Sequence, residues 1–231
     1  MNNPIRFIDP DGMLTDYYNL DGNKVKHVED GSSDKKIVLT SSKNAGKVDK
    51  AIANGEVVST PTNEAISKMD AAYKQTEATG NEYGFAVATD GSTSSLKTSG
   101  SDGSVKLSTS YEELSDAGKT SSYDVHTHPN VVSANGEIND VGAPSPSGTK
   151  GGTGKTGDTD SYGKDGPNNS PSVVLGYSVE KTTTTSQIGG TSSTSTTVTK
   201  QVGFYNGNGQ VGKPIDYSQF KKAATKVNNQ P

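Results

Sequence analysis

The sequence predicts an α+β fold in which a mixed β-sheet packs against helices. Three short apolar segments, at residues 82–88, 124–128 and 173–179, have the length and composition of buried strands. Residues 61–79 instead place apolar side chains three and four positions apart, which is the spacing of one face of a helix. Residues 130–171 consist mainly of Gly, Pro, Ser, Asn and Asp, a composition typical of a long loop.

Length and composition favour one compact domain with appended loop or tail segments. The chain has 231 residues, of which only 28% are apolar, so a core can occupy only part of the length. The absence of Cys excludes disulfides, thiolate zinc sites and a Cys nucleophile, so metal chemistry would use His, Asp and Glu. A net charge of −4 with scattered Lys predicts no nucleic-acid partner, and no apolar run is long enough to predict a membrane span.

Turn residues separate short extended segments in the N-terminal third of the chain. Residues 5–8 predict a strand closed by a turn, and residues 17–40 predict a hairpin or meander punctuated by Asp-Gly pairs. The helix predicted over residues 61–79 has Asn63 as its N-terminal cap and Gly80 as its end.

Strands and polar loops alternate towards the C-terminus. The strand at residues 82–88 is followed by a second strand near residues 104–108 and by the strand at residues 124–128, which Pro129 stops. The Thr- and Ser-rich residues 181–200 predict a long polar hairpin or mobile excursion. Residues 201–211 predict a hairpin around Asn-Gly turns, and residues 217–227 predict a short helix.

The first residues of the chain carry a recognisable string, because residues 2–13 read NNPIRFIDPDGM. This string resembles the closing signature of Rhs/YD-repeat cores, N-N-P-(I/V)-x-x-x-D-P-x-G-(L/M), after which a variable C-terminal toxin begins. The resemblance implies that residues 1–13 are the end of an Rhs core. It also implies self-cleavage near Met13 or Leu14, with Asp9 and Asp11 as candidate participants and the upstream Rhs shell as a required partner.

Two of the three His residues of the chain form the sequence His126-Thr127-His128. Side chains at positions i and i+2 of a strand point to the same face, and their α-carbons are about 6.6 Å apart, so both imidazoles could reach one metal ion. The alternative is that two polar side chains occupy the solvent face of an edge strand. An Asp-containing loop follows the pair and Glu82 stands at the end of a neighbouring strand, and both features favour the metal site.

Glu82, the sequence His126-Thr127-His128-Pro129 and the following Pro/Ser/Gly loop together resemble the JAB/JAMM (MPN+) metallopeptidases, whose pattern is Glu, H-(S/T)-H-P and S-x-x-D. The closer resemblance is to the JAB-like toxin domains attached to Rhs proteins. It implies a JAB/MPN-like, cytidine-deaminase-like fold over residues 61–231, with residues 14–60 as a linker or hairpin region. It also implies a Zn²⁺ ion bound by both His residues and an Asp, and Glu82 as the general base.

The loop sequence leaves the third metal ligand open. Where the family pattern ends in Asp, Ser147-Gly148-Thr149-Lys150 ends in Lys, and the next acidic residues are Asp158 and Asp160. Asp158 is preferred because it follows a Thr-Gly turn, Asp160 is a nearly equal candidate, and Asp140 is an outside alternative. The hydroxyl that polarises the substrate carbonyl would come from Ser147 or Thr156.

Two further motifs point elsewhere but lack their required context. Residues 151–156 (GGTGKT) resemble a phosphate-binding loop, but Thr149 stands where that loop needs Gly, and no apolar strand precedes it. Asp124, His126 and His128 fit the D-x-H-x-H opening of PHP-type metal phosphoesterases. Those enzymes need several more His residues, and only His27 remains, on an alternating strand that places it in solvent.

The resemblance predicts a zinc metallopeptidase toxin that is exported as part of a larger Rhs protein and cleaves a protein or peptide inside a target cell. A cognate immunity protein is the implied partner. A non-catalytic binding or structural domain with a degenerate metal site is one alternative, favoured by Lys150 and the displaced Asp. A metal-dependent hydrolase of phosphoesters or of base amino groups is another, since related folds perform both reactions.

Overall fold

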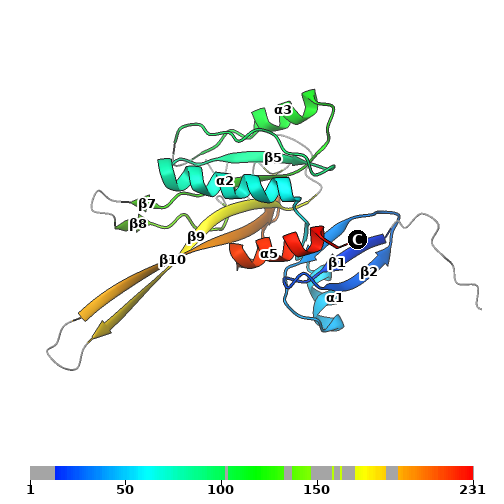
Figure 1. The fold of residues 1–231 in the computed structure, drawn as a ribbon, viewed down its shortest axis with the longest axis horizontal. Helices are drawn as coiled ribbons and strands as arrows, with labels where there is room; N and C mark the ends of the chain where they lie inside the picture. The colour runs from blue at the N-terminus through cyan, green and yellow to red at the C-terminus, as the bar shows by residue number, and fades with distance from the viewer. Residues whose placement is uncertain are drawn as a thin grey trace, which may run out of the picture.

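The predicted α+β class is confirmed by a computed structural model, which describes residues 14–101, 104–132, 137–146, 158, 162, 170–185 and 192–230. These residues form two mixed β-sheets of four and five strands, a separate pair of short strands and four helices (Figure 1). None of the helices in this described part is long and apolar enough to cross a membrane. The Rhs-like residues 1–13, with their predicted strand, lie outside the described residues.

The four-stranded sheet is built from the N-terminal part of the chain in the order β2-β1-β3-β4. β1 (Leu14–Tyr18) and β2 (Lys24–Glu29) form an antiparallel hairpin, as expected, whereas β3 (Lys35–Val38) runs parallel to β1 and antiparallel to β4 (Val57–Ser59). α1 (Ala45–Ala53) was not predicted, and it packs two buried side chains, Val48 and Ala51, against this sheet.

The five-stranded sheet has the order β11-β10-β9-β6-β5 and carries the residues of the predicted site. Its strands are β5 (Gly84–Ala88), β6 (Ser121–Thr127), β9 (Ser172–Thr185), β10 (Ser192–Asn206) and β11 (Gly209–Asp216). β6 and β9 are parallel, and the other neighbours are antiparallel. The polar segment predicted as a hairpin is the outer part of β9 and β10, which extends away from the body (Figure 1). The short strands β7 (Val131–Val132) and β8 (Ile138–Asp140) pair with each other.

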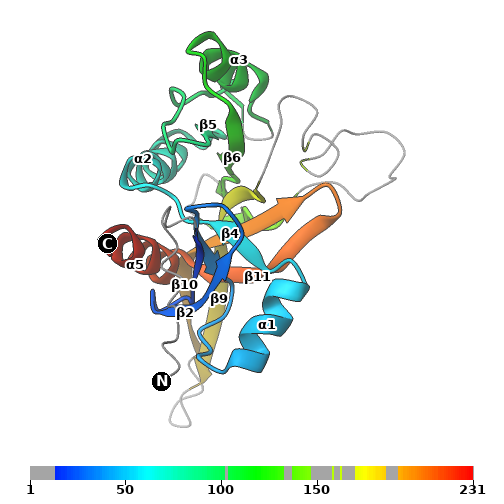
Figure 2. The same ribbon diagram turned by 90° about the vertical axis from the view of Figure 1, so that its right-hand side faces the viewer.

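Helices cover both faces of the five-stranded sheet. α2 (Asn63–Thr79) and α5 (Tyr217–Asn228) lie on one face, side by side (Figure 2), and the rings of Tyr73 and Tyr217 meet between them at 4.9 Å. α3 (Ser108–Asp116) covers the other face, where Tyr111 and Leu114 pack against Ala86 and Ala88. The strand predicted near residues 104–108 is wrong, because residues 104–107 form no strand and α3 begins at Ser108.

The first turn of α2 is capped by Thr62, so the predicted cap at Asn63 is wrong by one residue. The Thr62 hydroxyl accepts a hydrogen bond from the Ala65 amide at 3.2 Å and donates one to the Gly91 carbonyl at 2.9 Å. The helix ends at Gly80, as predicted, in the left-handed conformation with a φ of 73°.

Thr62→Ala is expected to lower the free energy of unfolding by about 1 kcal/mol, because one amide of the first turn loses its partner. Urea titration followed by circular dichroism measures the change. Ser67→Ala, which removes a hydroxyl from the exposed side of the same helix, serves as the matched control. Equal stability of the Thr62 and Ser67 variants would contradict this role for the cap.

Alternation along β5 and β6 decides which side chains face the site. Phe85, Val87, Tyr123 and Val125 belong to the large core beneath α2 and α5. The intervening positions of both strands point to the α3 face, because successive side chains on a strand point to opposite sides. His126 of β6 therefore shares this second face with Asp124.

Candidate metal centre

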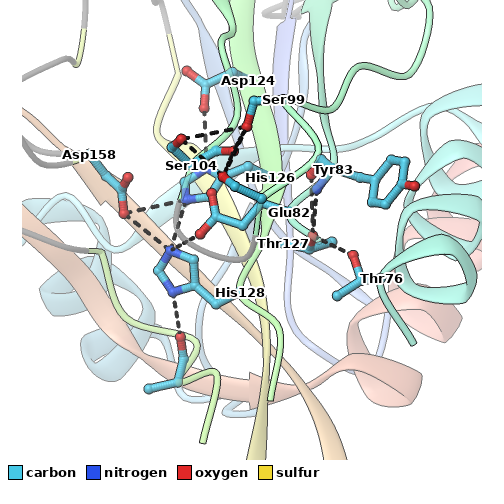
Figure 3. A network of polar contacts seen from close by, with 12 residues as sticks. Thr76, Glu82, Tyr83, Ser99, Ser104, Asp124, His126, Thr127, His128 and Asp158 are labelled. Atoms are coloured by element: carbon cyan, nitrogen blue, oxygen red, sulfur yellow. Dashed lines mark hydrogen bonds and ion pairs between the residues drawn. The ribbon is translucent and has the colours of Figure 1, made fainter. Parts of the chain in front are cut away.

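β6 places both imidazoles of the predicted pair on one face of the sheet. Although β6 ends at Thr127, the amide of His128 donates to the Leu175 carbonyl at 2.8 Å and keeps the backbone extended beside β9. The Nε2 atoms of His126 and His128 are 3.2 Å apart (Figure 3). The i, i+2 spacing thus brings the two rings together as the sequence predicts.

Asp158 completes a group of three potential metal ligands. Its Oδ2 lies 3.3 Å from Nε2 of His126 and 3.5 Å from Nε2 of His128. Within the described ranges, no other cluster of three His, Asp or Glu side chains could hold a metal ion. Asp160, Ser147 and Thr156 lie outside those ranges, and for Asp140 only the backbone, in β8, is described.

The three separations fit the ligand positions of one tetrahedral ion. An ion bound at about 2.0–2.1 Å with tetrahedral angles holds neighbouring ligand atoms about 3.3–3.4 Å apart. The observed separations of 3.2, 3.3 and 3.5 Å lie close to this value. His126, His128 and Asp158 could therefore hold a metal ion, and a fourth position would remain for water or substrate.

Exposure differs among the three side chains and opens the group on one side. The side chain of His126 is 3% exposed, whereas those of His128 and Asp158 are 16% and 19% exposed. Burial disfavours the charged imidazole of His126, but the carboxylates of Asp158 and Asp124 outweigh it and raise the pKa of His126. Burial likewise acts against the charged form of Asp158, but the two imidazoles lower the pKa of this carboxyl and keep it ionised.

A backbone carbonyl fixes the ring of His128. Its Nδ1 lies 2.9 Å from the Ala143 carbonyl oxygen, which can only accept a hydrogen bond, so Nδ1 is the donor and Nε2 points towards His126 and Asp158. The segment carrying Ala143 lies directly on the sheet. A Cβ at Gly176 or at Gly203 would collide with the backbone of residues 142–144.

Glu82 stands beside the three ligands because of the register between β5 and β6. Gly84 pairs with His126, and Glu82 and His128 each lie two residues beyond this pair. Oε1 of Glu82 therefore comes to 4.0 Å from Nε2 of His128. Gly84 lets β5 and Leu107 pack closely beside His126, because a Cβ there would lie 2.8 Å from Leu107 Cδ2 and from the Val125 carbonyl oxygen and 3.2 Å from the Cβ of His126. The Glu82 side chain is 11% exposed.

Comparison with protein-family models, with curated proteins and with solved structures finds no match to this chain. The chemistry of the site is therefore argued from its own residues.

Three hydroxyl groups on the face of the sheet that carries the site were not predicted from the sequence. The hydroxyl groups of Tyr111, Ser172 and Tyr205 donate hydrogen bonds to Asp124, next to His126. They come from α3, β9 and β10, so no local pattern links them. The position of Asp124 two residues before His126 was the one available signal, because it predicts a shared face.

Proposed function

We propose that this chain is a zinc-dependent hydrolase of peptide or isopeptide bonds, of the JAB/JAMM type, carried as the toxin of an Rhs protein. The observation that carries the proposal is the ligand triangle of His126, His128 and Asp158 with the Glu82 carboxylate beside it. The JAB/MPN-like fold, the Rhs origin of residues 1–13 and an immunity protein that binds the toxin belong to the same proposal.

The donor set favours zinc over the harder divalent ions. Two imidazoles and one carboxylate are typical ligands of a catalytic zinc ion with an open fourth position, whereas magnesium and calcium prefer oxygen ligands alone. A zinc ion held there would act as a Lewis acid and lower the pKa of a bound water to about 7.

The residues of this chain divide the work of hydrolysis between them. His126 and His128 would offer their Nε2 lone pairs, and Asp158 would offer Oδ2 and its negative charge. Glu82 would accept a proton at Oε1 from the attacking water and then deliver it to the leaving nitrogen as the carbon–nitrogen bond breaks. His126, His128 and Asp158 would thus act as ligands, and Glu82 would move the proton.

The alternative of a degenerate metal site is less favoured. That alternative rests on Lys150, which stands where the family pattern has Asp. Asp158, which comes later in the loop sequence, nevertheless lies beside the two imidazoles. A hydrolase of another bond type would use the same ligands, so the substrate assay has to include more than one bond class.

Removal of the metal tests the proposal directly. Purified protein is incubated with a peptide mixture, a lysine-linked isopeptide and a phosphodiester, each with and without a chelator. Cleavage of peptide or isopeptide bonds is expected, with loss on chelation and recovery on adding one equivalent of zinc. His128→Ala is expected not to recover. Cleavage that survives chelation, or phosphodiester cleavage alone, would contradict the proposal.

A further inference from the structure

A buried carboxylate lies behind His126, on the side away from the ligand triangle. Asp124 is only 4% exposed, and three hydroxyl groups contact it. Tyr111 donates to Oδ2 at 2.6 Å, Ser172 donates to Oδ2 at 2.8 Å, and Tyr205 donates to Oδ1 at 2.8 Å. Burial of a carboxylate is unfavourable by several kcal/mol unless such donors replace water, so the three hydroxyl groups stabilise the ionised form of Asp124.

The sheet register explains why these groups meet. Ser172 pairs with Tyr205 across β9 and β10, and the parallel register of β6 and β9 sets Asp124 beside Ser172. The three side chains therefore form one row on the face that α3 covers, and α3 adds Tyr111 from above. The carboxylate is held by its own strand, β6, and by donors from α3, β9 and β10. It can therefore hold the side chain next to it in place.

The neighbour that lacks a partner is the second ring nitrogen of His126. Among the described residues, the buried Nδ1 of His126 has no hydrogen-bond partner. The carboxylate oxygen Oδ1 of Asp124 lies 3.9 Å from it, while Nε2 on the opposite side of the ring faces His128 and Asp158. The ring of Tyr205 packs edge-on against the imidazole at 5.8 Å, so the same tyrosine contacts both groups.

We infer that Asp124 is a positioning residue that fixes the ring of His126 from the Nδ1 side and thereby directs Nε2 towards the metal position. The inference depends on the proposed zinc site. At 3.9 Å the interaction is electrostatic rather than a hydrogen bond, and with a metal ion on Nε2 the ring proton would stand on Nδ1, facing this fixed negative charge. Carboxylates that orient ligand imidazoles in this way raise metal affinity.

The two ligand imidazoles would then have different outer partners. His128 is fixed by the neutral carbonyl of Ala143 at 2.9 Å, and His126 by a full negative charge. A purely structural role for Asp124, as a hub that ties α3 to β9 and β10, would change stability alone. The affinity for zinc and the surroundings of the Nδ1 proton in the zinc-loaded protein separate the two roles.

The test uses Asp124→Asn, which keeps the shape of the side chain and removes its charge. Zinc affinity is measured by competition with a chromophoric chelator, and the Nδ1–H signal of His126 by nitrogen-15 NMR of the zinc-loaded protein. Zinc binding is expected to weaken by about 10- to 100-fold, and the Nδ1–H signal of His126 is expected to shift. Asp70→Asn is the matched control, because Asp70 also accepts a tyrosine hydroxyl, from Tyr217 at 2.9 Å, and lies on α2, which covers the opposite face of the sheet.

Tyr205→Phe is the second variant, and it guards against a folding defect in Asp124→Asn. It keeps the ring against His126 and removes one donor to the carboxylate, so a smaller loss of zinc affinity in the same direction is expected. Wild-type zinc affinity in Asp124→Asn with an unchanged Nδ1–H signal would overturn the inference. If the wild type bound no zinc, the proposed function would fail, whereas equal zinc binding by the wild type and Asp124→Asn would overturn this inference alone.

Discussion

Replacement of Glu82 by Gln is expected to lower the rate of hydrolysis by about 10²- to 10⁴-fold while the protein retains its zinc. Gln has nearly the same shape but cannot take up the proton that the reaction releases. Zinc should stay, because Glu82 lies outside the ligand triangle, 4.0 Å from Nε2 of His128. Initial rates and zinc content of the same preparations measure both effects.

Glu112→Gln is the matched control for this experiment, since Glu112 is an exposed residue of α3. It is expected to leave both rate and zinc content unchanged. A full hydrolytic rate in Glu82→Gln would remove the general base from the proposal. Loss of zinc in that variant would instead make Glu82 a ligand.

Replacement of His126 by Ala is expected to abolish zinc binding and the stabilisation that zinc provides. The wild type should contain about one zinc per chain, and zinc at 100 times its dissociation constant should stabilise the fold by about 2.7 kcal/mol. His126 is the most buried of the three candidate ligands, and its loss would leave only His128 and Asp158 to hold the ion. Elemental analysis and thermal unfolding with and without zinc measure the two effects.

His27→Ala controls for the loss of an imidazole, because His27 is exposed on β2 and far in sequence from the site. It should keep its zinc. Asp158→Ala should lose zinc and Asp160→Ala should keep it, which would name the third ligand. The reverse outcome for the two Asp variants would contradict the ligand triangle.

Local patterns were sufficient to predict the parts of the site that lie on one strand or on a strand pair. The two imidazoles follow from the i, i+2 rule, and α2 follows from its apolar spacing, with Gly80 as its end. The third ligand could not be derived in this way. Asp158 and Asp160 stand two residues apart in a polar sequence without periodicity, so no local rule chooses between them.

The wrong and missing elements also have a physical explanation. Val105 and Leu107 alternate as in a strand, but Tyr111 and Leu114 gain more by burying against Ala86 and Ala88, and this contact lies far away in the sequence. α1 was missed because it buries only Val48 and Ala51. The hydroxyls around Asp124 come from three distant elements and leave no sequence pattern at all.

The glycines on the face of the sheet that carries the site suggest a way to find distant relatives of this chain. Gly84 lets β5 pack closely against the backbone and Cβ of the His126 strand, and Gly176 and Gly203 let the backbone of residues 142–144 lie flat where it meets His128. Larger residues at these positions would displace either a ligand or its carbonyl partner. We therefore expect chains with this centre to keep small residues at these three places even where the loop that supplies the carboxylate has changed its length and sequence. A search that combines this glycine spacing with H-x-H-P would detect them when a motif defined by the loop does not.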